Sequence, residues 1–469
     1  MQRDLRTRKT FKQTFIGNRA FYGMVIAIVL PIIIQNTITN FVSLLDNIMV
    51  GRTGTEQMSG VSIANQLLFV FNLCVFGGVS GAGIFAAQFH GAGNHEGVRH
   101  CFRYKLIFSI ILVTAAIILF SALDKSLISL YLNDDNAAEQ VANTLKHGLD
   151  YLHIMMAGLL PFALTQTYAG TLRESGETTL PMRAGIAAVF VNLVFNYLLI
   201  YGKFGFPQMG VRGAAIATVL SRYVELAIVV VFTHRNSEKY RFIKGVYLSM
   251  HIPGKLVKAI TIKGMPLMLN ECLWATGMAT LTQCYSVRGL DVVAALNISS
   301  TVSNLFNVVF LSMGNATAII IGQVLGSGDS ERAMDHAWKL TATSVFGCFA
   351  TAALLACCAP FIPHIYRTTD SVRTLACRLL LVYSLCMPLF SLSNSAYFIL
   401  RSGGKTGITF LFDSGFTWAI CIPLAWILVH LTGMNIIWIY LCVQMMDLIK
   451  STFGFTLVKK GIWINNMVA

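Results

Sequence analysis

The segment PIIIQNTITNFVSLLDNIMVG, residues 31–51, combines the length of a membrane-spanning helix with a single acidic residue, Asp46. It continues an apolar run that begins at Phe21. At about 1.5 Å of rise per residue, the stretch from Tyr22 to Ile48 is long enough to cross a bilayer. Contact between a carboxylate and lipid costs several kcal/mol, so Asp46 is predicted to face the protein interior or a water-filled cavity. There it can take up and release a proton or a sodium ion. The alternative is an acid solvated near a helix end at the membrane surface.

The composition places the chain among integral membrane proteins. Of its 469 residues, 55% are hydrophobic and 12% are charged, whereas soluble domains contain about 25% charged residues. The net charge of +14 does not indicate nucleic-acid binding, because the basic residues lie in short connections, as expected for loops that remain inside the cell. The eleven cysteines lie mostly within apolar runs without metal-ligand spacing. They are therefore predicted to be reduced packing residues.

Hydropathy predicts twelve membrane-spanning helices, with both ends of the chain on the cytoplasmic side of the cell membrane. The predicted spans are 21–48, 56–88, 106–123, 147–170, 184–201, 212–232, 264–286, 292–323, 340–358, 376–400, 408–430 and 435–458. The predicted domains are a cytoplasmic segment at 1–20, an N-lobe at 21–232, a basic cytoplasmic linker at 233–263, a C-lobe at 264–458 and a cytoplasmic tail at 459–469. Within the linker, Lys255–Ile260 either lies flat on the anionic inner leaflet or belongs to a plain connection.

The two halves of the chain repeat. Moving residues 31–100 by 235 positions aligns them with 266–335 without a gap, and QFHGAGNHE then meets QVLGSGDSE. Further on, LRESGETT (172–179) is echoed by LRSGGKTG (400–407) at a shift of 228. Each copy holds six spans, so both insert the same way round. We expect the copies to be related by an axis along the membrane normal, with a cavity at their interface, as in transporters.

Polar residues inside the predicted spans indicate what lines this cavity. In the eighth span, four polar residues spaced 3, 4 and 3 apart share one helix face, and the second span repeats three of them. Such stripes either line water or hydrogen-bond to a neighbouring helix, and both interpretations remain open. The substrate cavity is predicted to include Asn65, Asn72, Asn270, Asn297, Ser300, Asn304, Asn307 and Asp413. The two deep acids, Asp46 and Glu271, are assigned to cation coupling together with Gln35, and Asn192 and Asn196 share one face of the fifth span.

Other charges within the spans are interpreted as local pairs. Glu225 follows Arg222 by three residues, and Asp447 precedes Lys450 by three, a spacing that allows pairing along one helix. Asp413 lies close to a loop and is kept as a candidate for coupling or substrate binding.

Two chemical motifs are considered and set aside. GGKTG (403–407) ends like a phosphate-binding loop, but Ile399 stands where the first glycine of that motif is required. GVSG (78–81) matches an intramembrane serine protease pattern, with His153 as a conceivable base. Its repeat partner contains no serine, and its glycines suit close helix packing. The chain is therefore predicted not to be an enzyme, and transport is expected to draw on an ion gradient.

These motifs together resemble the multidrug and toxic compound extrusion (MATE) family. The resemblance is carried by LLDNIMVGRTG (44–54), the QFHGAG and QVLGSG loops, LRESGETT and NLVFN, and NECLW (270–274) is similar to a variant in one bacterial branch. It implies two six-helix lobes around a V-shaped cavity and antiport of organic cations against H⁺ or Na⁺. It places the coupling acid of the first helix at Asp46 and the polar pair of the fifth at Asn192 and Asn196. Some archaeal members carry an aspartate where this chain has Asn196, which leaves the coupling ion open.

The resemblance implies an exchange mechanism. A cation bound at Asp46 or Glu271 displaces the exported compound, and the lobes then rock to release the cation inside. If the ion is Na⁺, its ligands would include Asp46, Asn192 and Asn196; no cofactor is expected. Expected partners are small organic cations and the lipid bilayer, not nucleic acid, with the protein a monomer. The alternatives are a lipid-linked precursor flippase of the same superfamily, a receptor or channel, or an intramembrane protease. The sequence leaves open the substrate and whether Glu271 serves ion or substrate.

Overall fold

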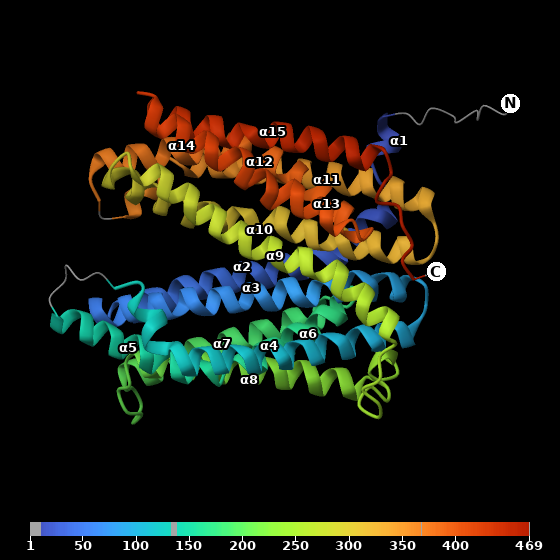
Figure 1. The fold of residues 1–469 in the computed structure, drawn as a ribbon, viewed down its shortest axis with the longest axis horizontal. Helices are drawn as coiled ribbons and strands as arrows, with labels where there is room; N and C mark the ends of the chain where they lie inside the picture. The colour runs from blue at the N-terminus through green and yellow to red at the C-terminus, as the bar shows by residue number, and fades with distance from the viewer. Residues whose placement is uncertain (1–10, 133–137, 367, 469) are drawn as a thin grey trace. The chain divides into compact units, whose positions relative to one another are not determined.

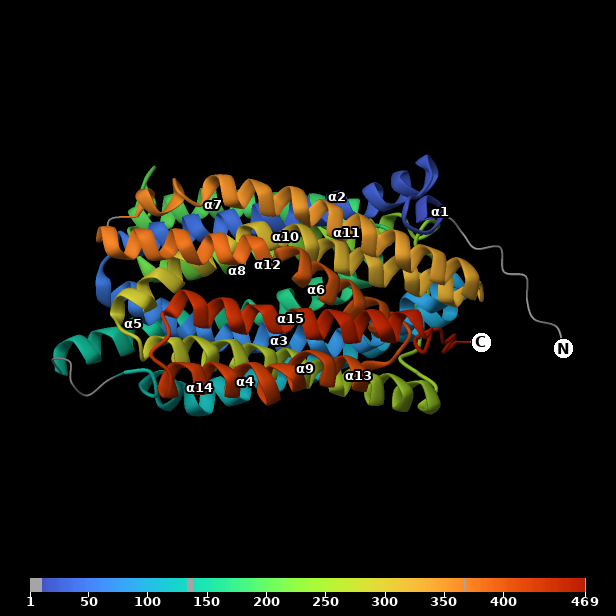
Figure 2. The same ribbon diagram turned by 90° about the horizontal axis from the view of Figure 1, so that it is seen from above.

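The computed structural model describes residues 11–132, 138–366 and 368–468, which form helices and the turns between them. No strand occurs within these ranges. Residues 1–10 of the predicted cytoplasmic segment and the centre of the acidic loop near 131–140 lie outside the described residues. Figure 1 and Figure 2 show the described helices from two directions.

The helices correspond one by one to the twelve predicted spans. Ten are long and apolar enough to cross a membrane as single elements, and α5 with α6, bent by 47°, makes an eleventh. The twelfth, α9, is a continuous 33-residue helix with a more polar sequence. The elements are α1 (Phe11–Phe15), α2 (Arg19–Gly51), α3 (Thr55–Gly91), α4 (His95–Ser129), α5 (Ala138–Met156), α6 (Leu159–Glu174), α7 (Thr179–Tyr201), α8 (Val211–Arg235), η1 (Arg241–Ile243), α9 (Gly254–Ser286), α10 (Leu290–Gly326), α11 (Ser330–Cys358), η2 (Ile362–Ile365), α12 (Asp370–Ser402), α13 (Thr406–Phe410), η3 (Leu411–Gly415), η4 (Thr417–Cys421), α14 (Ile422–Leu431) and α15 (Ile436–Lys459).

The repeat extends to the local backbone. α2 and α9 have the same length, as do α3 and α10, and the first residues of each pair are related by the shift found in the sequence. The residues before α3 and α10, Gly54 and Gly289, have φ values of 144° and 121°, a region that favours glycine. Asn94 and Asp329 cap α4 and α11 in the same way, each accepting a backbone N–H three residues on, at 2.8 and 2.9 Å.

The chain divides by contacts into two compact units. The N-terminal unit is Ile34–Cys272, and the C-terminal unit is Leu273–Ala469 together with Met1–Ile33. The boundaries therefore fall inside α2 and α9, whereas the sequence placed them in the connections. The reason is packing: Phe21 and Val25 of α2 are buried in one cluster with Ile320 and Leu340 of the C-terminal unit. The first half of α9 packs on α3 instead.

The connection after α8 is a packed part of the N-terminal unit. Phe242, Ile243 and Val246 are buried there, and Arg103 Nε donates to the Val246 carbonyl oxygen at 2.9 Å. Lys255–Ile260 forms the first turns of α9. α9 thus begins ten residues earlier than the span predicted at 264–286.

Glycines allow α3 and α9 to approach closely. A Cβ on Gly77 would lie 2.6 Å from the Met268 Cα, and one on Gly81 would lie 2.4 Å from the Gly264 Cα. Both distances are too short for a side chain, so the backbones are in contact, and the prediction that GVSGAG serves helix packing is confirmed.

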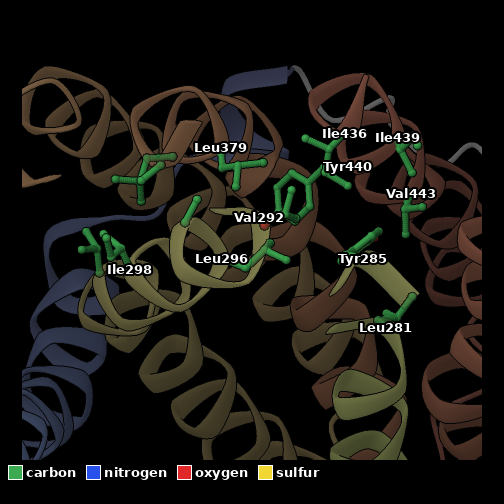
Figure 3. Packing of buried hydrophobic residues seen from close by; sticks show 14 of the residues in the cluster. Leu281, Tyr285, Val292, Leu296, Ile298, Leu379, Ile436, Ile439, Tyr440 and Val443 are labelled. Atoms are coloured by element: carbon green, nitrogen blue, oxygen red, sulfur yellow. The ribbon is translucent and has the colours of Figure 1, made fainter. Parts of the chain in front are cut away.

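The C-terminal unit has an apolar core at the crossing of α9, α10, α12 and α15. Figure 3 shows Leu281 and Tyr285 of α9 close to Tyr440 and Val443 of α15, with Val292 of α10 beside Tyr440. The rings of Tyr285 and Tyr440 lie 5.9 Å apart in an edge-to-face arrangement, a geometry that favours aromatic pairs.

Candidate functional site

A polar cluster in the N-terminal unit joins Asp46 of α2 to α7 and α8. Asn196 Nδ2 donates to Asp46 Oδ1 at 2.6 Å and lies 3.1 Å from Asn192 Oδ1. Asn192 and Asn196 are four residues apart and thus share one face of α7; their exposed fractions are 5% and 1%. The hydroxyl of Thr218 on α8 completes the cluster, 3.2 Å from the Asn192 amide. The structure thus brings together three of the five predicted coupling residues.

The amide of Asn192 can face Asp46 in a second orientation. With its nitrogen turned toward the carboxylate, it donates to both Asp46 oxygens at 3.0 and 3.1 Å, and its oxygen accepts from Thr218 at 3.2 Å. Amide orientation follows from the hydrogen-bond network, and this second orientation satisfies it better, because the first sets the amide oxygen against the carboxylate oxygens of Asp46. The Asn192 amide therefore donates toward Asp46.

The donor set of this cluster suits a small cation. Its members offer a carboxylate, two amide oxygens and a hydroxyl, and hard cations prefer oxygen ligands. Asn196 Oδ1 is buried and accepts no hydrogen bond within the described residues. A buried oxygen of this kind carries a free-energy cost that a bound cation would offset. Asp46 itself is half-buried, so the cluster can bind either a proton or a metal cation such as Na⁺.

Gln35 lies outside this cluster. It precedes Asp46 by eleven residues on α2, about 16 Å along the helix axis. Its side-chain oxygen accepts from Arg173 at 2.8 Å, and its amide lies against Gly185. The structure therefore separates Gln35 from the other coupling candidates in the N-terminal unit.

The predicted substrate residues of α3 and α9 are at least partly buried. Asn65 accepts from the Tyr151 hydroxyl at 3.3 Å, and Asn72 Oδ1 is buried without a partner among the described residues. Asn270 is 1% exposed and Glu271 is half-buried. The unit boundary lies immediately after Cys272.

The stripe on α10 is exposed along one helix face. Asn297, Ser300 and Asn304 are exposed, while Asn307 is half-buried and accepts from the Tyr383 hydroxyl at 2.9 Å. The three exposed residues have no hydrogen bond to another helix among the described residues, and Ser300 donates to the Asn297 carbonyl oxygen. Of the four stripe residues, Asn307 alone hydrogen-bonds to another helix within the described part of the C-terminal unit.

Asp413 pairs with a residue distant in sequence. Lys450 Nζ of α15 donates to Asp413 Oδ1 at 2.6 Å, so the direct partner of Lys450 is Asp413, and the predicted partner Asp447 acts on it only through its charge. Asp413 lies in a π-helical turn, η3, and a second one follows in η4. Pro423 follows these turns, and its missing N–H removes one helical hydrogen bond. Such π-turns change the side-chain register of a helix, which here directs Asp413 toward α15.

The predicted pairing of Arg222 with Glu225 is not a direct contact. Arg222 donates to the Gly158 carbonyl oxygen at 3.2 Å and lies 5.0 Å from the Phe162 ring centre. Across the described residues, it makes no direct ion pair with Glu225. The backbone of the α5–α6 bend thus provides a better acceptor than the neighbouring carboxylate.

The two residues considered for a serine protease, Ser80 and His153, hydrogen-bond to other partners. Ser80 donates to the Gly77 carbonyl oxygen of its own helix at 2.7 Å. His153 instead lies 2.8 Å from an oxygen of Asp124.

Sequence reasoning missed Thr218 and a buried ion pair. Thr218 looked like one of many small residues in span six, and only the packing of α7 on α8 brings it to Asn192. The predicted spans leave Lys105 and Glu174 in the connections beside them, but Lys105 is fully buried and pairs with Glu174 and with Thr171 at 3.2 Å. The one sequence feature that could have indicated this ion pair is the position of Lys105 directly before an apolar run.

Known proteins share both the sequence pattern and the fold. Residues 31–198 and 266–427, more than half of the chain, match the family model MatE. A probable multidrug resistance protein, NorM, of Thermotoga maritima is 27% identical over 66% of this chain and 64% of that protein, just under two thirds of its length. A probable NorM of Halalkalibacterium halodurans is 25% identical over 87% and 88%. A solved MATE family transporter of the MOP superfamily, described as outward-facing, superposes with a TM-score of 0.83 at 20% identity, covering 96% of this chain and 98% of that one.

The chain therefore belongs to the MATE family, a family of multi-pass membrane transporters, and it contains two helical repeats. The two matched segments begin at Pro31 and Pro266, the same two residues that the gapless shift aligns in the sequence. The predicted fold class of twelve helices in two six-helix repeats is confirmed.

Proposed function

We propose that this protein exports small organic compounds, cationic ones above all, by exchange for H⁺ or Na⁺. The observation that carries the proposal is the Asp46 cluster, a carboxylate surrounded by amide and hydroxyl oxygens inside membrane-spanning helices. Intramembrane carboxylates are costly and mark ion or substrate pathways. The names of the relatives, multidrug resistance proteins, support organic compounds as the exported class.

In this mechanism Asp46 carries the exchangeable charge. A proton neutralises the carboxylate, whereas Na⁺ would be held by Asp46 together with oxygens of Asn192, Asn196 and Thr218. A neutralised or occupied Asp46 no longer attracts a cationic compound, so ion binding favours its release. Asn196 orients the carboxylate through its 2.6 Å hydrogen bond. Coupling follows because the ion and the compound have different affinities for the two conformations.

Two further groups of predicted site residues are assigned to substrate binding and to a second carboxylate site. The exposed face of α10, with Asn297, Ser300 and Asn304, offers amide and hydroxyl groups to a compound in a water-filled path. Glu271 supplies a second carboxylate for the ion or for the compound. The protein is proposed to act as a monomer in the cell membrane with both termini in the cytoplasm.

The decisive experiment is antiport by purified protein in liposomes. A panel of fluorescent organic cations is loaded, and efflux is followed under an imposed pH gradient and, separately, an imposed Na⁺ gradient. We expect one gradient to drive wild-type efflux and Asp46→Asn to reduce that efflux to the rate of protein-free vesicles. Asn192→Leu separates the ions, because Na⁺ loses a ligand while Asp46 can still be protonated. Wild-type rates from Asp46→Asn under both gradients would refute the assignment of Asp46.

A further inference from the structure

Two cysteines of the N-terminal unit lie in contact outside the Asp46 cluster. Cys74 is near the middle of α3 and Cys272 near the middle of α9, and their Sγ atoms are 3.9 Å apart. Both are half-buried thiols. From the sequence, all cysteines were predicted to be packing residues, and these two are not part of a CxxC motif.

Backbone packing fixes this separation. α3 and α9 run antiparallel, and three contacts follow in register along them: Cys74 with Cys272, Gly77 with Met268, and Gly81 with Gly264. The two glycine contacts bring the helix backbones together within one and two turns of the thiols. The sulfur pair is therefore preorganised by the fold, which lowers the cost of binding a ligand between the two atoms.

The other repeat has no sulfur at the equivalent sequence positions. At a shift of 235, Val309 stands in place of Cys74, and Thr37 stands in place of Cys272. The repeated sequence pattern therefore does not specify cysteine at these two positions.

We propose that Cys74 and Cys272 form a two-coordinate binding site for a thiophilic metal ion such as mercury(II). A linear sulfur–metal–sulfur arrangement separates the sulfurs by about 4.6 Å, twice a metal–sulfur distance of about 2.3 Å. The observed 3.9 Å lies closer to that value than to the ~2.05 Å of a disulfide. Among the described residues, no cluster of three or more His, Cys, Asp or Glu side chains is placed to hold a metal, which favours a two-coordinate soft ion over zinc.

The binding step is a simple exchange of protons for metal. Mercuric chloride reacts with the two thiols to give a bis-thiolate complex, and two equivalents of HCl leave. Mercury remains in the +2 state and sulfur is not oxidised, so no oxidant or reductant takes part. The neutral HgCl₂ molecule can reach thiols in the middle of membrane helices.

Bound metal would tie α9 to α3 at the last residue of the N-terminal unit. α9 continues from Cys272 into the C-terminal unit, and Pro266 lies within the same helix. A metal bridge therefore restrains bending of α9 near this boundary. That consequence rests on the proposed transport function, whereas binding itself does not.

The test is protection from alkylation, measured for each cysteine by mass spectrometry. Purified reduced protein receives one equivalent of HgCl₂, followed by N-ethylmaleimide. In the wild type we expect Cys74 and Cys272 to be protected together. Cys74→Ser should raise the HgCl₂ concentration that half-protects Cys272 by about 10²-fold or more, because the second bond of a bidentate site forms at high effective concentration. Cys272→Ser should do the same for Cys74.

The matched control is Cys377→Ser on α12, another half-buried cysteine, which should leave protection of the pair unchanged. If a serine variant folds poorly, Cys74→Ala replaces it in the same assay. Equal protection of Cys272 with and without Cys74 would overturn the proposal, because each thiol would then bind mercury alone. Dye efflux, inhibited by HgCl₂ in the wild type and resistant in Cys74→Ser, tests the restraint of α9 separately. Intact protection without inhibition would refute the restraint of α9 but not the metal site.

Discussion

The two repeats build the same helix framework around opposite kinds of interior. In the N-terminal repeat, Asp46 of α2 meets Asn196 and Asn192 in a buried polar cluster. At a shift of 235, the second repeat places Leu281 at the position of Asp46. Leu281 is 8% exposed and lies in the apolar core at the crossing of α9 and α15 (Figure 3). The fold therefore does not need a polar residue at this repeat position. A function of the first repeat accounts better for the polar cluster at Asp46.

The C-terminal repeat carries its charges elsewhere. When the first residues of α8 and α15 are aligned, Arg222 and Glu225 correspond to Asp447 and Lys450, with the signs reversed. Lys450 pairs with Asp413 from a π-helical turn, whereas Arg222 binds a backbone carbonyl oxygen. The repeat thus preserves the positions of the helices but not the identity or the partners of their charged residues.

The largest expected effect concerns the buried pair of Lys105 and Glu174. The second repeat has Leu340 and Ser402 at these positions. Lys105→Leu alone should lower the free energy of unfolding by about 3–5 kcal/mol, because it leaves a carboxylate buried without its partner. Denaturant titration of the purified protein in detergent measures this loss.

Adding Glu174→Ser to Lys105→Leu gives the first repeat the two residue types that the second repeat has at these positions. The double variant should recover most of the lost stability, since replacing a buried ion pair as a whole is often neutral. A double variant as unstable as Lys105→Leu would show that the two repeats are not interchangeable here.

A smaller effect is expected at Gly81, whose repeat partner is Ala316. Gly81→Ala places a Cβ 2.4 Å from the Gly264 Cα, so α3 and α9 must separate. The free energy of unfolding should fall by about 1–3 kcal/mol, as for overpacking in other cores. Gly347→Ala, at a helical position of α11 with open space around it, serves as a control for adding a methyl group without a close contact. Equal losses would mean that close packing is not the cause.

Glu177 makes a pH-dependent contribution to the free energy of unfolding. The second repeat has Lys405 at the matching position. Partial burial acts to raise the pKa of Glu177, but hydrogen bonds and charge from Lys239, with the Leu180 N–H and the Tyr240 hydroxyl, outweigh it and the pKa is lowered. The stabilisation is therefore present above the unfolded pKa of 4.5 and is lost as the pH falls through the folded value. Glu177→Gln should cost about 1–2 kcal/mol near neutral pH.

The pH profile distinguishes this effect from simple loss of contacts. Thermal unfolding is measured at pH 7 and below pH 4. The unfolding temperature of Glu177→Gln should lie below that of the wild type at pH 7, and the two temperatures should agree below pH 4. A difference that is independent of pH would contradict the assignment.

The smallest effect on stability is expected at Asn304 on the exposed face of α10. Asn304→Ala should change the free energy of unfolding by less than about 0.5 kcal/mol, as for other exposed positions. Asn307→Ala, which removes the acceptor of the Tyr383 hydroxyl, should cost about 1 kcal/mol. Equal losses at both positions would indicate that the whole stripe joins α10 to another helix.

The sequence predicted much of the candidate site but not its contacts. Asn192 and Asn196 could be paired because residues four apart share a helix face. Their meeting with Asp46 in one cluster came from the family resemblance, not from spacing. Thr218 could not be identified, because small hydroxyl residues are common in membrane helices and only the packing of α7 on α8 selects this one.

The sequence by itself determined the class, the twelve helices and the repeat, because apolar length and a gapless internal alignment are properties of the chain alone. Only the tertiary structure decided which charges meet. Lys450 pairs with Asp413 rather than Asp447, and Lys105 is buried against Glu174, since a buried charge takes the partner that packing brings nearest. The same holds for Cys74 and Cys272, which are far apart in the chain and are brought together by glycines that allow two helix backbones to touch.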